Sequence, residues 1–430
     1  MNIYRNLVKN YNWNVLNKIN RIKLFNNVSK RKTNKIITKD FDKIMSVYDN
    51  ILHKVGPMAI INHFNKKIDE FNHTNIENEE ILFLSNLRKF PNMTSNTSKS
   101  ENVLLKHVNC SKSYENPQSK DTVDIGKTLK IIKLGPKLTY SYGERAYILE
   151  GHAALLHKAI IMHIVDVLRN KGFLFLSVSD IVEESLVAGC GFNVNTDTTQ
   201  VYKILNQKFQ NMCLSGTGEI GIANYLKGQK FKKSQLPLKF ATVSKCYRSE
   251  ISPLKSESGL YRVHDFSKVE MFGITENSIE KSNLVFQEFL NIQNEIFSNF
   301  CSNYRILEMG TKELGNPAFR KIDIEAYLPS RKNFGEISSL SNCTDYQSVR
   351  LGINYTDNED ESPVHTINGT AGALTRLIMV ILENNQVNNK VKIPKVLEKY
   401  MGSSYLQMNR IAKQIHLLPS KVYKTKLNVV

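Results

Sequence analysis

Apolar residues recur at intervals of three and four along residues 146–169, which read AYILEGHAALLHKAIIMHIVDVLR. This period is typical of a helix with one buried face, and it predicts a long helix that ends near Gly172 and leads into the strand FLFLSV. Further helices are predicted over 278–297 and within AGALTRLIMVILENN. Residues 40–87 carry a shorter helical period, and the Ser-, Asn- and Lys-rich stretch 90–121 indicates a linker or an exposed loop.

Strands are predicted mainly in the second half of the chain. They are KFATVSKCYR (239–248), LYRVHDFSKVEMFGI (260–274), DIEAYLP (323–329), FGEISSLSN (334–342) and VHTING, which ends at Gly369. Strands joined by hairpins, with helices packed on one side, indicate an antiparallel α+β sheet. The sequence has no internal repeat, no Walker loop and no G-x-G-x-x-G fingerprint.

Composition changes this picture at the amino terminus. The chain of 430 residues is 41% hydrophobic, which is enough for a large core, and its formal charge is +18. Ten of its 58 Lys and Arg fall in residues 1–39, which contain no Asp or Glu. This acid-free basic segment predicts a mitochondrial transit peptide over 1–39, because a positive amphipathic helix is drawn across a membrane that is negative inside. A basic arm that touches RNA is the alternative.

The sequence also indicates the compartment. No run of about 18 apolar residues occurs, so membrane insertion is not expected. The six cysteines are scattered, without a C-x-x-C pair or a nearby His at ligand spacing, which argues against a disulfide framework and a structural zinc site. Reduced thiols suit the mitochondrial matrix.

Residues able to handle a phosphate or a base recur at every second position around KCYRSEISPLKSESGLYRVHDFSKVEMFG (245–273). If both flanks are strands, these side chains project from one face of a hairpin: Arg248, Glu250, Arg262, His264, Phe266 and Glu270. A nucleotide bound there would lay its base on Phe266, offer its phosphates to Arg248 and Arg262, and be read by Glu250. A solvated amphipathic hairpin is the alternative.

Three other segments carry candidate chemistry. Arg376 stands in the apolar helix LTRLIMVIL and needs an anion or a π-face unless it reaches the surface, because a buried unpaired charge is costly. Glu336 and Ser339 in FGEISSLSN are oxygen ligands suited to a Mg²⁺ held mainly by phosphates. Thr217 and Glu219 in GTGEIG would hydrogen-bond a small amine and hydroxyl. Taken singly, Glu336 and the Thr217/Glu219 pair are more often ordinary loop residues than ligands of a metal or a substrate.

The same segments resemble a known family. CYRSE followed by GLYRVHDFSKVEMFG resembles motif 2 of class II aminoacyl-tRNA synthetases, and HTINGTAGALTRLIMVILENNQ resembles motif 3. The segments GTGEIGIANYL, FRKIDIEAYLPSRKNFGEISSLSNCTDYQSVRL and IPKVLEKYMG make the resemblance specific to seryl-tRNA synthetases of the mitochondrial type. It covers roughly residues 126–402. It implies a catalytic antiparallel sheet of six to seven strands, a dimer, and the coupling of L-serine to ATP and then to tRNA(Ser).

The resemblance implies roles for the candidate residues. In the ATP site, Arg248 would hold the α-phosphate and the serine carboxylate, and Glu250 would read the adenine amino group. Phe266 and Arg376 would sandwich the adenine, and Arg262 would meet the far phosphates. The catalytic cations would be Arg248 and Arg376. Because the serine carboxylate is already a nucleophile, the reaction needs placement and positive charge rather than a base.

Serine and magnesium have their own implied ligands. Glu336 and Ser339 would hold Mg²⁺. The serine amine would be recognised by a group of three residues: Thr217, Glu219 and Glu270. The serine hydroxyl would lie near Asn342 and Thr370.

The chain departs from the family pattern in two ways. First, four positions carry unusual residues. Ser179 replaces the proline of motif 1, and in motif 2 Ser258 stands where Arg is usual and Asp265 where His or Gln is usual. Val349 replaces the first Arg of a paired Arg-Arg. The predicted tRNA-binding arm, residues 40–100, is short, since two helices of roughly 20 residues would each reach only about 30 Å. The catalytic domain would follow over 101–413, with a basic tail at 414–430.

Two functions remain open from these departures. The first is a working ligase that charges serine tRNAs. A shortened arm also resembles the insect mitochondrial seryl-tRNA synthetase-like proteins, which are regarded as binding tRNA without aminoacylation. The second function is therefore a binding module that holds tRNA(Ser) or pairs with the true synthetase, so the dimer would be a homodimer or a heterodimer.

Overall fold

The computed structural model describes seven continuous stretches from residue 90 onward, the helix over 35–55 and several single residues between 24 and 87. The stretches are 90–109, 119–135, 145–194, 199–205, 211–250, 259–387 and 390–409. Most of the predicted transit peptide, the motif 2 loop with Ser258 and the basic tail lie outside the described residues. Within them, no helix is both long and apolar enough to cross a membrane.

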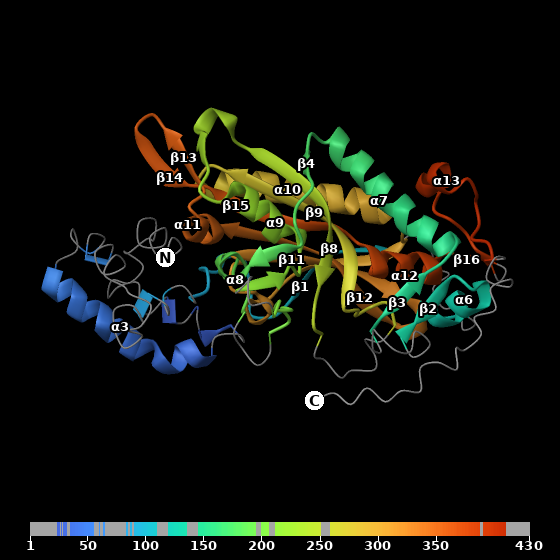
Figure 1. Ribbon diagram of the computed structural model, residues 1–430, viewed down its shortest axis with the longest axis horizontal. Helices are drawn as coiled ribbons and strands as arrows, with labels where there is room; N and C mark the ends of the chain where they lie inside the picture. Colours follow the sequence, from blue (N-terminus) through green and yellow to red (C-terminus); the bar gives the residue numbers. More distant parts are fainter. Residues whose placement is uncertain are drawn as a thin grey trace.

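An eight-stranded sheet runs through the molecule in the order β1-β10-β11-β12-β15-β9-β8-β4 (Figure 1). Its strands are β1 (Val103–Asn109), β4 (Leu174–Leu176), β8 (Leu238–Tyr247), β9 (Asp265–Thr275), β10 (Asn303–Glu308), β11 (Arg320–Leu328), β12 (Asn333–Thr344) and β15 (His365–Ala373). Neighbours are antiparallel except β4 and β8. The α+β class is confirmed, whereas the implied count of six to seven strands is too low because β1 and β4 extend the two edges. The stretch 90–121 is thus not only a linker.

Smaller elements surround this sheet. The short strands are β2 (Ile132–Leu134), β3 (Tyr147–Leu149), β5 (Ile181–Glu183), β6 (Met212–Leu214), β7 (Lys230–Lys232), β13 (Asn354–Asp357), β14 (Asp360–Pro363), β16 (Gln386–Val387) and β17 (Lys390–Val391). The helices are α3 (Lys35–Val55), α6 (Thr122–Leu129), α7 (His152–Asn170), α8 (Glu184–Gly189), α9 (Gly218–Leu226), α10 (Ile279–Ser298), α11 (Tyr346–Leu351), α12 (Leu374–Asn384) and α13 (Lys395–Met401).

Side-chain alternation gives the sheet two different faces. On β9, Val269 and Met271 belong to the largest apolar cluster, which they share with α7, α10 and α12. Lys268 and Glu270, which alternate with Val269 and Met271 along β9, point to the other face. There the start of α9 packs tightly, since a Cβ on Gly218 would lie 2.5 Å from Thr242. Helices α7, α10 and α12 therefore cover one face, whereas the other face carries α9 and, beside it, the polar side chains of a site.

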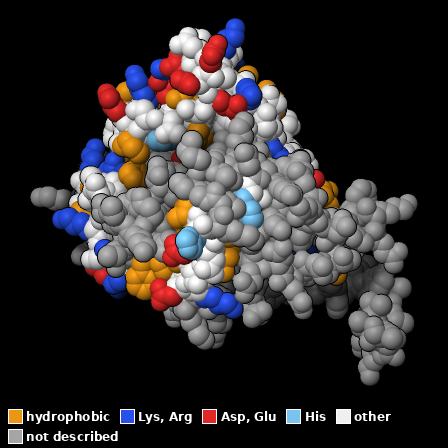
Figure 2. All heavy atoms as spheres, turned by 90° about the vertical axis from the view of Figure 1, so that its left-hand side faces the viewer, with side chains coloured by type: hydrophobic (Ala, Val, Ile, Leu, Met, Phe, Trp, Pro, Cys, Tyr) orange, Lys and Arg blue, Asp and Glu red, His pale blue; other side chains and the backbone are white. Residues whose placement is uncertain are grey.

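The amino-terminal region lies at one end of the molecule, where Figure 1 shows α3. Helix α3 has 21 residues, so it is about 32 Å long. Its apolar side belongs to a separate cluster that includes Phe41, Met45 and Val349 of α11. Seen from this end, acidic and basic side chains intermix at the top of the face (Figure 2), where β7 and the β13–β14 hairpin pair through Lys230 and Glu361.

Candidate active site

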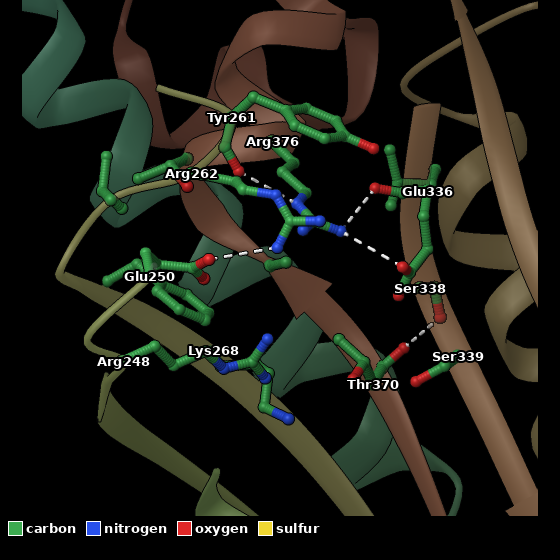
Figure 3. A pocket seen from close by; sticks show the side chains of 15 residues that line it. Arg248, Glu250, Tyr261, Arg262, Lys268, Glu336, Ser338, Ser339, Thr370 and Arg376 are labelled. Carbon is green, nitrogen blue, oxygen red and sulfur yellow. Dashed lines mark hydrogen bonds and ion pairs between the residues drawn. The ribbon is translucent and has the colours of Figure 1, made fainter. Parts of the chain in front are cut away.

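A pocket lies where the ends of β8 and β9 meet β12, β15 and the start of α12 (Figure 3). The ladder continues past the end of β8, because Arg248 N donates to His264 O at 2.9 Å. The cavity has a volume of about 60 Å³ and opens to solvent. Its lining includes Arg248, Glu250, Tyr261, Arg262, Phe266, Lys268, Glu336, Ser339, Thr370 and Arg376.

Four of the six residues predicted to share one hairpin face line this pocket. They are Arg248, Glu250, Arg262 and Phe266. Glu270 pairs with Lys268, whose side chain is part of the lining. His264 differs from the prediction, because its Nδ1 lies 2.8 Å from Tyr202 Oη and its ring is not part of the lining.

Two cations flank the hairpin loop: Arg248 follows the end of β8, and Arg262 precedes the start of β9. Arg248 lies with its guanidinium carbon 5.3 Å from the centre of the Phe266 ring, and its Nε donates to Gly216 O at 3.3 Å. Arg262 donates to Glu250 Oε2 at 3.1 Å. Glu250 has a φ of +43°, a conformation rare for a residue with a side chain. This turn follows the end of β8 at Tyr247 and leaves the buried carboxylate in reach of Arg262.

Arg376 contacts both kinds of partner that the sequence predicts for it, a π-face and an anion. Its guanidinium carbon lies 4.5 Å from the centre of the Tyr261 ring. Nη1 donates to the Glu336 carbonyl oxygen at 2.8 Å and lies 3.6 Å from the Glu336 carboxylate. Phe266 and Arg376, which are predicted to sandwich an adenine, both line the pocket, and the ring in contact with Arg376 is that of Tyr261. Sequence reasoning missed Tyr261, although it directly precedes Arg262.

A β-bulge brings Glu336 and Ser339 to the same pocket. Residues three apart on a regular strand point to opposite faces. The pairing with β11 shifts between Glu336 and Ser338, so Ile337 is an extra residue on β12. Burial raises the pKa of Glu336, yet Arg376 and three further cations outweigh it and hold the pKa below its usual range. Its side chain is 41% exposed, so an ionised oxygen ligand is accessible.

Lys268 occupies the position between the predicted serine ligands. Its Nζ donates to Thr217 Oγ1 at 2.7 Å and pairs with Glu270 Oε2 at 2.5 Å. Thr217 also caps α9, because its hydroxyl accepts from Glu219 N. Thr370 Oγ1 lies 3.3 Å from Glu270 Oε2. The structure thus brings Thr217, Glu270 and Thr370 together around a lysine that the sequence reasoning passed over.

Glu219 lies in a buried polar layer next to this lysine. Its Oε1 accepts hydrogen bonds from Gln347 Nε2 at 2.5 Å and from Asn368 Nδ2 at 2.8 Å. Burial, together with the negative charge of Glu270, raises the pKa of Glu219 to about 7, against the opposing effects of Lys268 and Gln347. The carboxyl group therefore titrates near neutral pH.

Asn342 does not lie near the other predicted serine ligands. Its Nδ2 donates to Ser282 Oγ on α10 at 3.0 Å, so the side chain faces the helix-covered side of the sheet. The physical reason is alternation along β12, where Ser339 and Asn342 differ in parity. Asn368 takes the place expected for Asn342, since it contacts Glu219 two residues before Thr370 on β15. The sequence could have indicated this, because Asn368 and Thr370 are two residues apart on a predicted strand and therefore share a face.

Two residues at or next to the departures from the family pattern lie outside the pocket lining: Asp265, and Arg350, which follows Val349. Arg350 is buried beside the amino-terminal region, where Nη1 donates to Tyr346 O at 2.8 Å and Nη2 to Phe90 O at 3.3 Å. It is therefore not part of the pocket lining. Asp265 pairs with Lys245 at 2.8 Å on the half-exposed end of the hairpin, also outside the lining.

The fold and the pocket define a class II tRNA synthetase core. The family model described as tRNA synthetase class II core domain (G, H, P, S and T) matches residues 202–385. The mitochondrial serine-tRNA ligase of Mus musculus is 37% identical over 312 residues, which are 72% of this chain and 60% of that protein. The serine-tRNA ligase of Borrelia garinii subsp. bavariensis is 38% identical over 322 residues, 74% of each chain.

The chain belongs to the serine-tRNA ligase family. A solved relative is the seryl-tRNA synthetase of Pyrococcus horikoshii complexed with ATP, with a TM-score of 0.79 at 25% identity. That likeness covers 92% of this chain and 99% of the other. The cytoplasmic enzyme of Naegleria fowleri, crystallised with AMP, shares the fold with a TM-score of 0.78 at 22% identity. The chain spans about 60% of the length of the mitochondrial relatives.

Proposed function

We propose that this protein activates L-serine with ATP and transfers the seryl group to tRNA(Ser) in mitochondrial translation. The observation that carries the proposal is one pocket in which Arg248, Arg262 and Arg376 converge beside the Phe266 ring. Three cations and an aromatic face suit a polyphosphate joined to a base. The family membership supports the same substrates.

Binding of ATP to this pocket would replace contacts between the pocket side chains by contacts with the nucleotide. Arg262 would leave Glu250 for the far phosphates, so that Glu250 is free to accept from the adenine amino group. Arg248 would hold the α-phosphate and the serine carboxylate in line. Because Arg376 is already fixed by Tyr261 and Glu336, the adenine would lie between it and Phe266 with little loss of side-chain freedom.

Mg²⁺ would be held by Glu336 and Ser339, which fit the metal as hard oxygen ligands. The lowered pKa of Glu336 keeps the carboxylate ionised. The described residues contain no group of three or more His, Cys, Asp or Glu that suits a metal, so the remaining ligands would be phosphate and water oxygens. The metal would supply positive charge for the phosphates.

The serine amine would replace Lys268 at its contacts with Thr217 and Glu270, and Lys268 would turn toward the open pocket. Glu219 adds negative charge behind this position, with Thr370 beside the hydroxyl. The role predicted for Asn342 is not proposed, since its side chain faces α10.

The remaining parts of the proposal concern location and partners. The basic start of the chain would direct it to the mitochondrial matrix, residues 40–100 would be a short tRNA-contacting region, and 101–413 the catalytic domain, with 414–430 as a basic tail. Exposed apolar side chains on α7 and β4, Met162 and Leu174, support a dimer with an identical chain or with another seryl-tRNA synthetase.

The test is serine- and ATP-dependent exchange of labelled pyrophosphate, followed by charging of tRNA(Ser). Exchange together with charging is expected. The alternative function is a paralogue that binds tRNA(Ser) without aminoacylating it, and the limited length of helix α3, 21 residues, favours it. No exchange, together with tRNA binding that weakens steeply with salt, would establish this alternative.

A further inference from the structure

Arg31 lies inside the folded catalytic unit, although its sequence context assigns it to a transit peptide. The side chain is 2% exposed. Its two terminal nitrogens donate to five backbone carbonyl oxygens and one hydroxyl. The closest acceptors are the carbonyls of Asn92 and Gly315, at 2.7 Å each, and that of Ala318 at 3.0 Å. The others are Thr94 Oγ1, Met93 O and Asn316 O.

Leu24 and Asn27 join Arg31 on one side of the same segment. Leu24 and Asn27 are helical and three residues apart, and Arg31 follows four residues later in a bend. Leu24 is 2% exposed and packs in the cluster that contains α3. Asn27 Nδ2 donates to Asn92 O at 2.8 Å, and its Oδ1 accepts from Thr94 Oγ1. We call Leu24, Asn27 and Arg31 the amino-terminal clamp.

The clamp is connected to the floor of the serine pocket through Asn92. The Asn92 side chain donates to Pro317 O at 2.9 Å and to Cys343 O at 2.8 Å, at the end of β12. The Cys343 thiol in turn lies 3.4 Å from Nδ2 of Asn368, which holds Glu219. Removal of the clamp would leave several buried carbonyl groups without donors, which is destabilising.

We propose that the amino-terminal clamp stays in the mature protein as part of the catalytic unit, and that any proteolytic processing ends before Leu24. A presequence would then be confined to about the first 23 residues rather than to 1–39. This inference rests on the proposed mitochondrial location for its processing step. The burial of the clamp is independent of that location.

Processing is tested by expressing the full chain with a carboxy-terminal tag in eukaryotic cells and measuring the intact mass from purified mitochondria. A mature chain that starts at or before Leu24 is the expected result. A start after Leu24 would overturn the inference. A full-length chain found outside mitochondria would contradict the proposed location. The structural role of the clamp would then be tested by the melting temperatures of the variants below.

The structural role is tested with Arg31→Gln and the matched control Lys30→Gln, since Lys30 is an exposed neighbour with the same charge. Both variants are made in the full chain. Arg31→Gln is expected to lower the melting temperature by roughly 5 °C, and Lys30→Gln by less than about 1 °C. Equal melting temperatures for the two variants would show that the clamp is not part of the folded unit.

Discussion

The guanidinium of Arg376 is held against the ring of Tyr261, with 4.5 Å between the guanidinium carbon and the ring centre, and its Nε donates to the Tyr261 carbonyl oxygen. The ring also lies over Gly335, where a Cβ would come within 2.9 Å of Tyr261 Cε2. Two segments far apart in the sequence thus fix the cation that closes the pocket. Tyr261 therefore acts through Arg376 as a positioning residue.

Tyr261→Ala is expected to raise the KM for ATP in pyrophosphate exchange about 10-fold, because Arg376 loses its cation–π partner. Tyr261→Phe keeps the ring and should stay within about 2-fold. The KM for serine should change little in either variant. Equal effects of the two substitutions would show that the ring does not position Arg376.

Arg262→Gln should weaken ATP binding about 10-fold or more, because the cation proposed for the far phosphates is lost. Calorimetric titration with ATP and Mg²⁺ measures this directly. Lys245→Gln is the control, since Lys245 pairs with Asp265 on the same hairpin but outside the pocket. Equal affinities for the two variants would exclude Arg262 from phosphate binding.

Glu219→Gln is expected to gain stability relative to the parent protein as the pH rises. Burial and Glu270 raise the pKa of Glu219 to about 7 from its ordinary value of 4.5. The folded state therefore resists ionisation. The cost in stability is absent below about pH 4.5, grows as the pH rises toward 7 and is complete above it, where it is about 3 to 4 kcal/mol.

Melting temperatures of both proteins at pH 5 and pH 8 measure this dependence. The difference between variant and parent should be larger at pH 8. The exposed Glu359, changed to Gln, serves as the control and should show no such trend. A difference for Glu219→Gln that is the same at both pH values would mean that the carboxyl group ionises normally.

Asn368→Ala and Asn342→Ala should have opposite consequences. Asn368 contacts Glu219, so its loss is expected to raise the KM for serine about 10-fold. Asn342 bonds to Ser282 on α10, so its loss should cost about 1 to 3 kcal/mol of stability and leave the KM for serine unchanged. Serine-dependent exchange and thermal melting separate the two effects. A raised KM for serine in Asn342→Ala alone would restore the prediction made from the sequence.

Leu174→Lys is expected to convert a dimer into a monomer, because Leu174 is 54% exposed on the edge strand β4. Light scattering after size-exclusion chromatography measures the mass. Leu284→Lys on α10 is the matched control, since that leucine is 62% exposed but lies on a helix away from β4. A parent protein that is already monomeric would refute the proposed dimer.

The sequence determined the elements and most of the hairpin face. The apolar period fixed helices α7, α10 and α12 and the strands β8, β9, β11, β12 and β15, because such periods are set by which side chains must leave water. The sequence also grouped Arg248, Glu250, Arg262 and Phe266. Only Phe266 lies within a strand, and the other three lie just beyond the ends of β8 and β9, yet all four line the same pocket.

The tertiary structure alone decided how distant segments meet. The bulge at Ile337 brings Glu336 and Ser339 into one pocket, and parity on β12 turns Asn342 toward α10. Packing of α9 against β9 places Thr217 beside Lys268, among the residues predicted to bind serine, and docking of the amino terminus buries Arg31. These contacts depend on register and long-range packing, which a local pattern of polar and apolar residues does not encode.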